Sequence, residues 1–249
     1  MVVVVPRNAC LFLDFDGTLV DFAPNPKSVF VTPDLVPLLI ALRKRFDGAL
    51  AVITGRTLDD IDRFLWPLRL PTAALHGTVR RDVLGKGMVD EGISVDEFAG
   101  SSHRVRRQFQ RWAEQYPGVI VEDKGLAVAL HFCSAQSQWT PTSGDRKSLE
   151  SMLTTDLELL FGDLVLEVRP RGRDKSMAVE AFMAESPFMN RIPIYVGDDI
   201  VDLPAMKLIE CQDGISIAVG ARINARLCLS DPTALRRWLT SILRSSDLS

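Results

Sequence analysis

The feature that most constrains the fold is a repeated alternation of short apolar runs with segments of helical spacing. Apolar runs at 10–13, 49–53 and 72–75 are separated by two stretches whose apolar residues recur every three or four positions. Such short runs are typical of buried strands, and parallel strands need a crossover between them, usually a helix. The first part of the chain therefore predicts a parallel sheet with helices on its faces.

The middle of the chain departs from this alternation. The stretch GVIVEDKGLAVALHF, at 118–132, has two β-rich runs around the polar turn Asp123-Lys124-Gly125, which is typical of a hairpin. We expect helices at 102–116 and 146–160 and a further strand at 164–168. This part of the chain therefore predicts a separate α+β unit that contains a hairpin.

After residue 171 the alternation of apolar runs and helical segments resumes. The pattern predicts strands at 192–196 and 215–219 and helices at 175–183, 203–209 and 235–243. We therefore expect one α/β core formed by residues 1–81 and 171–249, with residues 82–170 inserted between its halves as a cap.

Three predicted strands of the core end in polar residues. The first ends in LDFDGT, the second in VITGR and a later one in YVGDDIVD. The side chains in question are Asp14 and Asp16, then Thr54, Gly55 and Arg56, then Asp198, Asp199 and Asp202. Because ligands of open parallel sheets bind beyond the carboxyl ends of the strands, we expect these motifs to converge on one crevice.

Asp14, Asp16 and Asp198 would place several carboxylates in a small volume. Two like charges about 4 Å apart repel by roughly 4 kcal/mol at an effective dielectric constant near 20. A bound cation removes this repulsion, and oxygen ligands without histidine or thiolate favour Mg²⁺. Since Mg²⁺ commonly bridges protein carboxylates and a substrate phosphate, the motifs predict a Mg²⁺-dependent phosphate site.

The same residues can perform phosphoryl transfer. A carboxylate such as Asp14 can attack phosphorus and form an aspartyl-phosphate, provided that nearby positive charge offsets the repulsion from the phosphate. Lys175, at the start of a predicted helix, is the candidate for that charge. Asp16 can donate a proton to the leaving oxygen and then accept one from water, and Thr54 can donate a hydrogen bond to the phosphate.

The order DFDGTL, TGR, lysine and GDDxxD resembles the haloacid-dehalogenase-like (HAD) phosphatase superfamily, and the resemblance covers the whole core. It implies a Rossmann-like core, in which a parallel sheet is flanked by helices. It also implies that the inserted α+β module is the larger, C2-type cap of that superfamily, which closes over the active site.

The resemblance also implies a role for each motif residue. Asp14 would be the nucleophile and Asp16 the acid and base, with Mg²⁺ bound by Asp14, the main-chain carbonyl of Asp16 and Asp198. Thr54, Gly55 and Lys175 would bind the phosphate. Asp202, and Asp199 in the same way, would not bind the ion directly but would contact its ligands or reach the ion through a water molecule.

Several longer stretches resemble trehalose-6-phosphate phosphatases: LDFDGTLVDFAPNP, VITGR, LHGTVRRD, VEDKGLAVALHF, LEVRPRGRDKS and GDDIVD. They follow one another in the same order over nearly the whole chain. The resemblance implies hydrolysis of trehalose 6-phosphate to trehalose and phosphate, a reaction of trehalose biosynthesis. It further implies that the substrate is contacted by Arg56 and by Glu122, Lys124, His131 and Glu167, since sugar hydroxyls need polar partners.

The chain departs from that family's usual pattern at three places. It has His131-Phe132-Cys133 where the family often has His-Tyr-Arg, GDDIVD where GDDxTDE is frequent, and Lys175-Ser176 where Lys-Gly is usual. No proposed catalytic group is lost. The first departure concerns the preference for one sugar, and the second concerns the affinity for Mg²⁺.

Three alternatives to trehalose 6-phosphate hydrolysis remain open at this point. The same chemistry can act on another sugar phosphate, of the sucrose-phosphate or glycosylglycerate-phosphate type. A non-catalytic regulator that binds a phosphosugar is disfavoured, because a binding module does not need a paired nucleophile and acid. A phosphomutase would need a sugar bisphosphate to re-enter the site, and the resemblance of the cap disfavours it.

Composition excludes several broad classes of function. The formal net charge is −3, which gives no basic footprint for nucleic acid, and no apolar stretch is long enough to cross a membrane. The four cysteines show neither CxxC nor zinc spacing, so we expect reduced thiols. The sequence therefore predicts a cytoplasmic enzyme, acting as a monomer on a small molecule.

Overall fold

A computed structural model of the chain describes residues 5–23, 26–89, 94–132, 139–162 and 164–245. The chain divides into two compact units. The first consists of Met1–Ala23, Val29–Met88 and Asp174–Ser249, and the second of Pro24–Ser28 and Val89–Arg173.

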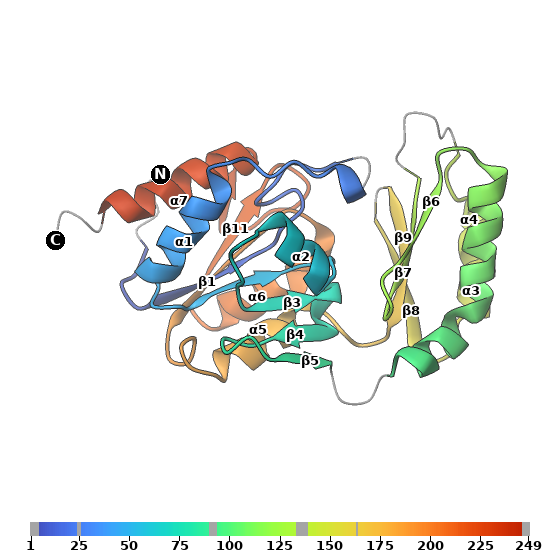
Figure 1. Ribbon diagram of the computed structural model, residues 1–249, viewed down its shortest axis with the longest axis horizontal. Helices are drawn as coiled ribbons and strands as arrows, with labels where there is room; N and C mark the ends of the chain where they lie inside the picture. Colours follow the sequence, from blue (N-terminus) through green and yellow to red (C-terminus); the bar gives the residue numbers. More distant parts are fainter. Residues whose placement is uncertain (1–4, 24–25, 90–93, 133–138, 163, 246–249) are drawn as a thin grey trace. The chain divides into compact units, whose positions relative to one another are not determined.

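The first unit is built on a mixed, mostly parallel sheet with the strand order β12-β11-β10-β1-β2-β3-β4-β5 (Figure 1). Its parallel strands are β1 (Ala9–Leu13), β2 (Leu50–Ile53), β3 (Thr72–Ala74), β10 (Ile192–Gly197), β11 (Ile215–Val219) and β12 (Leu227–Leu229). At one edge β4 (Val79–Arg81) pairs antiparallel with β3, followed by β5 (Gly87–Val89). The predicted parallel sheet is confirmed, and the antiparallel edge is an addition to it.

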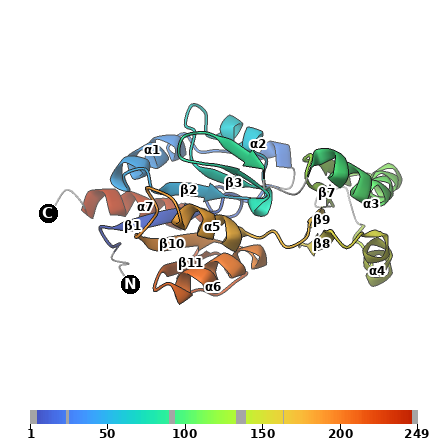
Figure 2. The ribbon, with the colours of Figure 1, turned by 90° about the horizontal axis from the view of Figure 1, so that it is seen from below.

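Helices cover both faces of this sheet. α1 (Leu35–Arg45), α2 (Leu58–Phe64) and α7 (Pro232–Ser245) lie on one face, and α5 (Lys175–Met183) and α6 (Leu203–Cys211) lie on the other (Figure 2). Because both faces are covered, the central strand β1 is buried along its whole length and its sequence is apolar throughout. Phe12 of β1 stacks on Phe188, with the ring centroids 5.3 Å apart.

The second unit has an antiparallel sheet in the order β6-β7-β9-β8, with α3 (Val95–Gln115) and α4 (Ser143–Met152) on one of its faces (Figure 1). Its strands are β6 (Ile120–Asp123), β7 (Val128–His131), β8 (Leu157–Phe161) and β9 (Val165–Pro170). β6 and β7 form the predicted hairpin around Lys124 and Gly125. α3 begins earlier than predicted, because Ser94 and Glu97 form a capping box there.

The predicted helix at 146–160 is wrong in its second half. α4 ends at Met152, and the residues from Leu157 onward form β8. The leucines of this segment fit a helical spacing, but β8 pairs antiparallel with β9 over its full length, from Leu157 opposite Pro170 to Phe161 opposite Leu166. Pairing with a distant strand therefore overrides the local pattern.

Candidate active site

The site lies at the carboxyl ends of β1 and β10, which are neighbours in the centre of the sheet. Leu13 is paired with Val196, and the amide of Asp14 donates to the carbonyl of Val196 at 2.9 Å. Asp14 and Asp198 therefore leave adjacent strands at the same edge, although 184 residues separate them. Carboxylate oxygens of Asp14, Asp198 and Asp202 all lie within 4.8 Å of one another.

Lys175 bridges two of these carboxylates. Its Nζ donates to Oδ1 of Asp14 and to Oδ1 of Asp202, at 2.6 Å in each case. Lys175 is the first residue of α5, and the helix begins there because Asp174 accepts hydrogen bonds from the amides of Ser176 and Met177. The N-terminal cap of α5 therefore fixes the start of the helix at Lys175, whose buried ammonium group contacts Asp14.

Asp202 is held by four hydrogen bonds. Besides Lys175, its Oδ1 accepts from the hydroxyl of Tyr195 at 2.6 Å, and its Oδ2 accepts from the amides of Asp198 and Asp199 at 3.1 Å. A carboxylate has about four lone-pair positions, so those of Asp202 are occupied. Asp202 therefore supports the Asp198 turn and Lys175, whereas Asp14 and Asp198 keep oxygen positions for a cation.

Burial and repulsion shift the pKa values in this cluster. Burial raises the pKa of Asp14 well above its usual range, and the charges of Asp202 and Asp198 add to this rise, against the opposing effect of Lys175. Burial, and then the charge of Asp202, raise the pKa of Asp198 to about 7. Burial lowers the pKa of Lys175, but the neighbouring Asp14 and Asp202 more than reverse this, so the pKa is raised and the ammonium stays charged. Carboxylates with such raised pKa values, and with no sulfur or nitrogen donor among them, fit a hard divalent cation.

The turn after Asp14 packs directly against Asp198. Gly17 has a positive φ of 75°, and a Cβ on it would lie 2.2 Å from Oδ2 of Asp198, so that only glycine fits. The hydroxyl of Thr18 donates to Oδ1 of Asp198 at 3.4 Å. Thr18 was not predicted as a site residue, although its position directly after Gly17 in the first motif was a sequence signal for this contact.

Asp16 points to a different partner from the other acidic residues. Its two carboxylate oxygens accept from Nε and Nη2 of Arg56 at 2.7 and 2.6 Å, in a two-pronged ion pair. The Asp16 side chain is therefore outside the three-carboxylate cluster. The pairing brings the first and second sequence motifs together, but it was not evident from either motif alone.

Thr54 and Gly55 form a tight loop at the end of β2. Oγ1 of Thr54 accepts from the amide of Arg56 at 3.1 Å, and a Cβ on Gly55 would lie 2.6 Å from Nε2 of His76. Leu75 and His76 have positive φ values of 49° and 57°, an unusual conformation for residues with side chains. Their amides donate to the carbonyls of Arg56 and Thr54. His76 was not predicted to be a neighbour of this loop, and its position before Gly77 was the available sequence signal.

Asp199 and Arg222 lie beside the cluster. Asp199 accepts from the amide of Ile200 at 2.7 Å. Nη1 of Arg222 is 3.8 Å from Asp198 and 3.7 Å from Asp199, and its guanidinium lies over the ring of Phe22 at 5.5 Å. Arg222 was also missed, and no motif around it marks it in the sequence.

The remaining predicted residues belong to the second unit, where they form two side-chain pairs. Nε2 of His131 is 2.8 Å from Oε2 of Glu122, and Nζ of Lys124 is 2.6 Å from Oε2 of Glu167. Ala129 is paired with Glu122 on one side and with Glu167 on the other, so these acidic side chains share one face of the sheet.

Two further expectations concern cysteines and membranes. Cys10, Cys211 and Cys228 are free thiols, whereas Cys133 lies outside the described residues. Among the described helices, none is long and apolar enough to cross a membrane.

The chain is similar to known phosphatases in sequence. A family model described as "Trehalose-phosphatase" matches residues 12–226. A "Probable trehalose-phosphate phosphatase" of Sinorhizobium fredii is 36% identical, over 91% of this chain and 84% of that protein. The "Trehalose-6-phosphate phosphatase" of Escherichia coli is 34% identical, over 84% of this chain and 76% of that protein.

Solved structures agree with this similarity. A "trehalose-6-phosphate phosphatase related protein" has a TM-score of 0.79 and 28% identity, and the match covers 96% of this chain and 98% of that one. A phosphatase of the haloalkanoate (HAD) superfamily from Bacteroides thetaiotaomicron has a TM-score of 0.65 at 18% identity, and 99% of each chain is covered. The second comparison shows that the fold is that of the HAD superfamily.

Proposed function

The chain belongs to the trehalose-phosphatase family, and on that premise we propose that it hydrolyses trehalose 6-phosphate to trehalose and inorganic phosphate. The observation that supports this most strongly is the buried contact of Lys175 with Asp14, beside the carboxylate of Asp198. Such a site can bind and attack a phosphate, whereas a module that only binds sugar has no use for a buried carboxylate held by a lysine. The enzyme class is phosphoric monoester hydrolase.

Asp14 is the nucleophile in this proposal. One of its oxygens attacks phosphorus, the bond from phosphorus to the sugar oxygen breaks, and an aspartyl-phosphate forms. Lys175 orients Asp14 through its 2.6 Å hydrogen bond, and its charge offsets the repulsion between the carboxylate and the incoming phosphate. Water then attacks the phosphorus, which releases phosphate and restores the Asp14 carboxylate.

Asp16 acts as the acid and base. It donates a proton to the leaving sugar oxygen in the first step and takes a proton from the attacking water in the second. The carboxylate of Asp16 is paired with Arg56, and a carboxylate in an ion pair holds a proton weakly. Asp16 therefore acts as the proton donor after this ion pair loosens on substrate binding. Arg56, freed from Asp16, then has donors for the substrate.

Mg²⁺ would be held by Asp14, Asp198 and the main-chain carbonyl of Asp16. The donor set fits, because it offers only oxygens and because the carboxylates of Asp14 and Asp198 are buried and repel each other. When bound, the ion would supply positive charge that offsets the repulsion of the phosphate by the attacking carboxylate. Asp202 and Asp199 hold the turn that carries Asp198.

Thr54, Gly55 and Lys175 bind the phosphate oxygens. The Thr54 hydroxyl can donate because it uses its oxygen, and not its proton, to accept from the amide of Arg56. Because Gly55 has no side chain, the phosphate can approach the main chain of this loop closely. All of these groups, with the nucleophile, belong to the first unit of one chain, so the proposed working unit is a monomer.

We further propose that residues 82–170 act as the specificity cap. Glu122, Lys124, His131 and Glu167 supply the hydrogen-bond donors and acceptors that a disaccharide requires. Their pairing into Glu122–His131 and Lys124–Glu167 gives these polar side chains hydrogen-bond partners within the unit.

The test is a phosphate-release assay on a panel of sugar phosphates, with Mg²⁺ and with excess chelator. The panel contains trehalose 6-phosphate, sucrose 6-phosphate, a glucosylglycerate phosphate and p-nitrophenyl phosphate. We expect trehalose 6-phosphate to give the highest kcat/KM, and chelator to abolish release from every ester. A higher kcat/KM for another sugar phosphate would support the phosphatase mechanism but contradict trehalose 6-phosphate as the substrate. No release from any ester would contradict a phosphatase and favour a non-catalytic regulator that binds a phosphosugar.

A further inference from the structure

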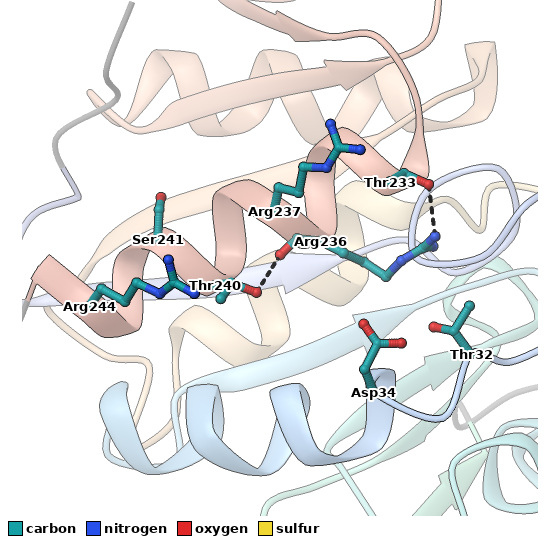
Figure 3. A pocket seen from close by; sticks show the side chains of 8 residues that line it. All are labelled: Thr32, Asp34, Thr233, Arg236, Arg237, Thr240, Ser241 and Arg244. Carbon is teal, nitrogen blue, oxygen red and sulfur yellow. Dashed lines mark hydrogen bonds between the residues drawn. The ribbon is translucent and has the colours of Figure 1, made fainter.

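A groove of about 390 Å³ lies in the first unit between α7 and the segment that leads into α1 (Figure 3). Arg236, Arg237 and Arg244 line it from α7, together with hydroxyl groups of the same helix, and Thr32 and Asp34 line it from the other side. It shares no lining residue with the carboxylate cluster. Its volume is within the range of small-molecule sites.

Positive charge dominates this groove. Its lining contains three arginines and a single carboxylate, that of Asp34. Two carboxylates interact electrostatically with these arginines: Arg236 helps to lower the pKa of Asp34, and Arg237 helps to lower the pKa of Asp231, which does not line the groove. A ligand that brings negative charge would therefore be attracted here, and guanidinium groups bind phosphate through paired hydrogen bonds.

Arg236 is the fixed part of the groove. It is only 9% exposed, and its guanidinium donates to Oγ1 of Thr233 at 3.0 Å and to the carbonyl of Leu19 at 2.9 Å. A guanidinium has five N–H donors, so these two bonds set its direction and leave donors for a ligand. A cationic group that is oriented in advance loses less entropy on binding than a mobile surface side chain does.

The acidic and hydroxyl groups of the groove define the rest of the ligand. Asp34 repels a phosphate but accepts hydrogen bonds from alcohols, and Thr240 and Ser241 also offer hydroxyl oxygens. We infer that this groove binds a small phosphate ester that carries free hydroxyl groups, with its phosphate on the arginines of α7 and its hydroxyls toward Asp34.

Arg236 also connects the groove to the catalytic turn. Leu19, whose carbonyl it binds, belongs to the turn that begins at Asp14, and the amide of Leu19 donates to the carbonyl of Phe15 at 2.9 Å. The preceding Thr18 contacts Asp198. A ligand on the groove shares the Arg236 guanidinium with the carbonyl of Leu19 and weakens that hydrogen bond, so occupancy lowers kcat. This part of the inference rests on the proposed function.

Binding is tested by calorimetry on the full chain without metal, with glycerol 3-phosphate, inorganic phosphate and glycerol as probes. Metal is left out because Mg²⁺ commonly bridges protein carboxylates and a phosphate, so its removal weakens phosphate binding at the catalytic cluster and the titration reports on the groove. We expect one site for glycerol 3-phosphate, weaker binding of inorganic phosphate by at least about threefold, since the contacts from the hydroxyls are lost, and none for glycerol. Equal affinity for both phosphates would overturn the assignment to an ester, and no binding would overturn the site.

Two double variants locate the binding. Arg237→Ala with Arg244→Ala should weaken glycerol 3-phosphate binding by about tenfold or more, because charge-assisted hydrogen bonds are removed. Arg43→Ala with Lys44→Ala, which removes two exposed cations of α1 outside the groove, should leave the affinity unchanged. Equal losses in the two double variants would mean attraction by general charge and would overturn the groove.

The link to catalysis has its own measurement. Glycerol 3-phosphate added at saturating trehalose 6-phosphate should lower kcat of the wild type by about fivefold, which is at the lower end of ordinary coupling between sites. It should leave kcat of the Arg237→Ala, Arg244→Ala variant unchanged. Binding without any change in kcat would overturn the link alone. Absence of turnover in the wild type would count against the proposed function, while the calorimetry would still decide the groove.

Discussion

The charged side chains of the first unit and those of the second unit are held in different ways. In the first unit, Lys175 joins Asp14 to Asp202, and Asp202 in turn holds backbone amides of the turn that carries Asp198. In the second unit, polar side chains meet as pairs: Glu122 of β6 contacts His131 of β7, and Lys124, in the turn between these strands, contacts Glu167 of β9.

This difference indicates how each region responds to change. In a connected network, the loss of one group alters the position and charge of the others, so every substrate is affected. A pair of two side chains can be changed with smaller effects on its surroundings than a connected network, so its loss mainly affects the ligands that contact it. We therefore expect general effects on chemistry from the first unit and selective effects on substrates from the second.

Asp14→Asn is expected to have the largest effect. Loss of the nucleophile should lower kcat by about 10⁴-fold or more on trehalose 6-phosphate and on p-nitrophenyl phosphate alike. Phosphate release is measured for both, with circular dichroism to show that the fold is retained. Asp47→Asn, at an exposed pair with Arg191, is the matched control and should retain full activity. Substantial turnover by Asp14→Asn would contradict a nucleophilic role.

Glu122→Ala tests whether the second unit affects substrate preference without affecting the chemical step. We expect kcat/KM for trehalose 6-phosphate to fall by about 100-fold, because a charged hydrogen bond to the sugar and the partner of His131 are lost, while the value for p-nitrophenyl phosphate changes little. Exposed Glu114→Ala on α3 serves as the control. An equal loss on both substrates would remove Glu122 from the sugar site.

The pH dependence of Mg²⁺ binding tests the electrostatics of the network. Mg²⁺ competes with the proton on Asp198, whose pKa is raised to about 7, so affinity should rise by about tenfold between pH 6 and pH 8. Calorimetric titration with MgCl₂ measures it. An affinity that does not change over this range would show that Asp198 is already ionised at pH 6 or does not bind the ion.

The same shift predicts the stability of the metal-free protein. The folded state holds the Asp198 proton more tightly than the unfolded state does, so the free energy of unfolding should fall as the pH rises from about 4 to about 7. Thermal unfolding in chelator follows this trend. In Asp198→Asn the fall should be smaller, since the titrating group is gone.

Tyr195→Phe should have the smallest effect on activity, and it tests whether a change in the connected network of the first unit reaches the catalytic residues. The substitution removes one hydrogen bond to Asp202 and should lower the free energy of unfolding by about 1–2 kcal/mol. Because Asp202 holds Lys175, we also expect kcat to fall by about threefold on both esters. Tyr116→Phe, in the second unit, is the matched control. An unchanged kcat would limit Tyr195 to a structural role.

Much of the fold was predictable because its signals are local. The strands around Phe12, Val52 and Ile217 are short apolar runs, and the hairpin at Lys124 has its turn residues next to each other. The error at Leu157–Phe161 arose where a local pattern was compatible with both helix and strand. There the choice was made by pairing with β9, a contact that the segment itself does not encode.

Which groups lie at the strand ends is readable from local sequence, because Asp14, Asp16, Thr54 and Asp198 each follow a recognisable strand. Their partners follow from the packing of the folded chain. Lys175 meets Asp14 across 161 positions, Arg56 meets Asp16 across 40, and Tyr195 meets Asp202 from within a buried strand. The reason is physical: a strand and its turn depend on a few adjacent residues, whereas a hydrogen bond between distant side chains depends on how the whole sheet and its helices pack.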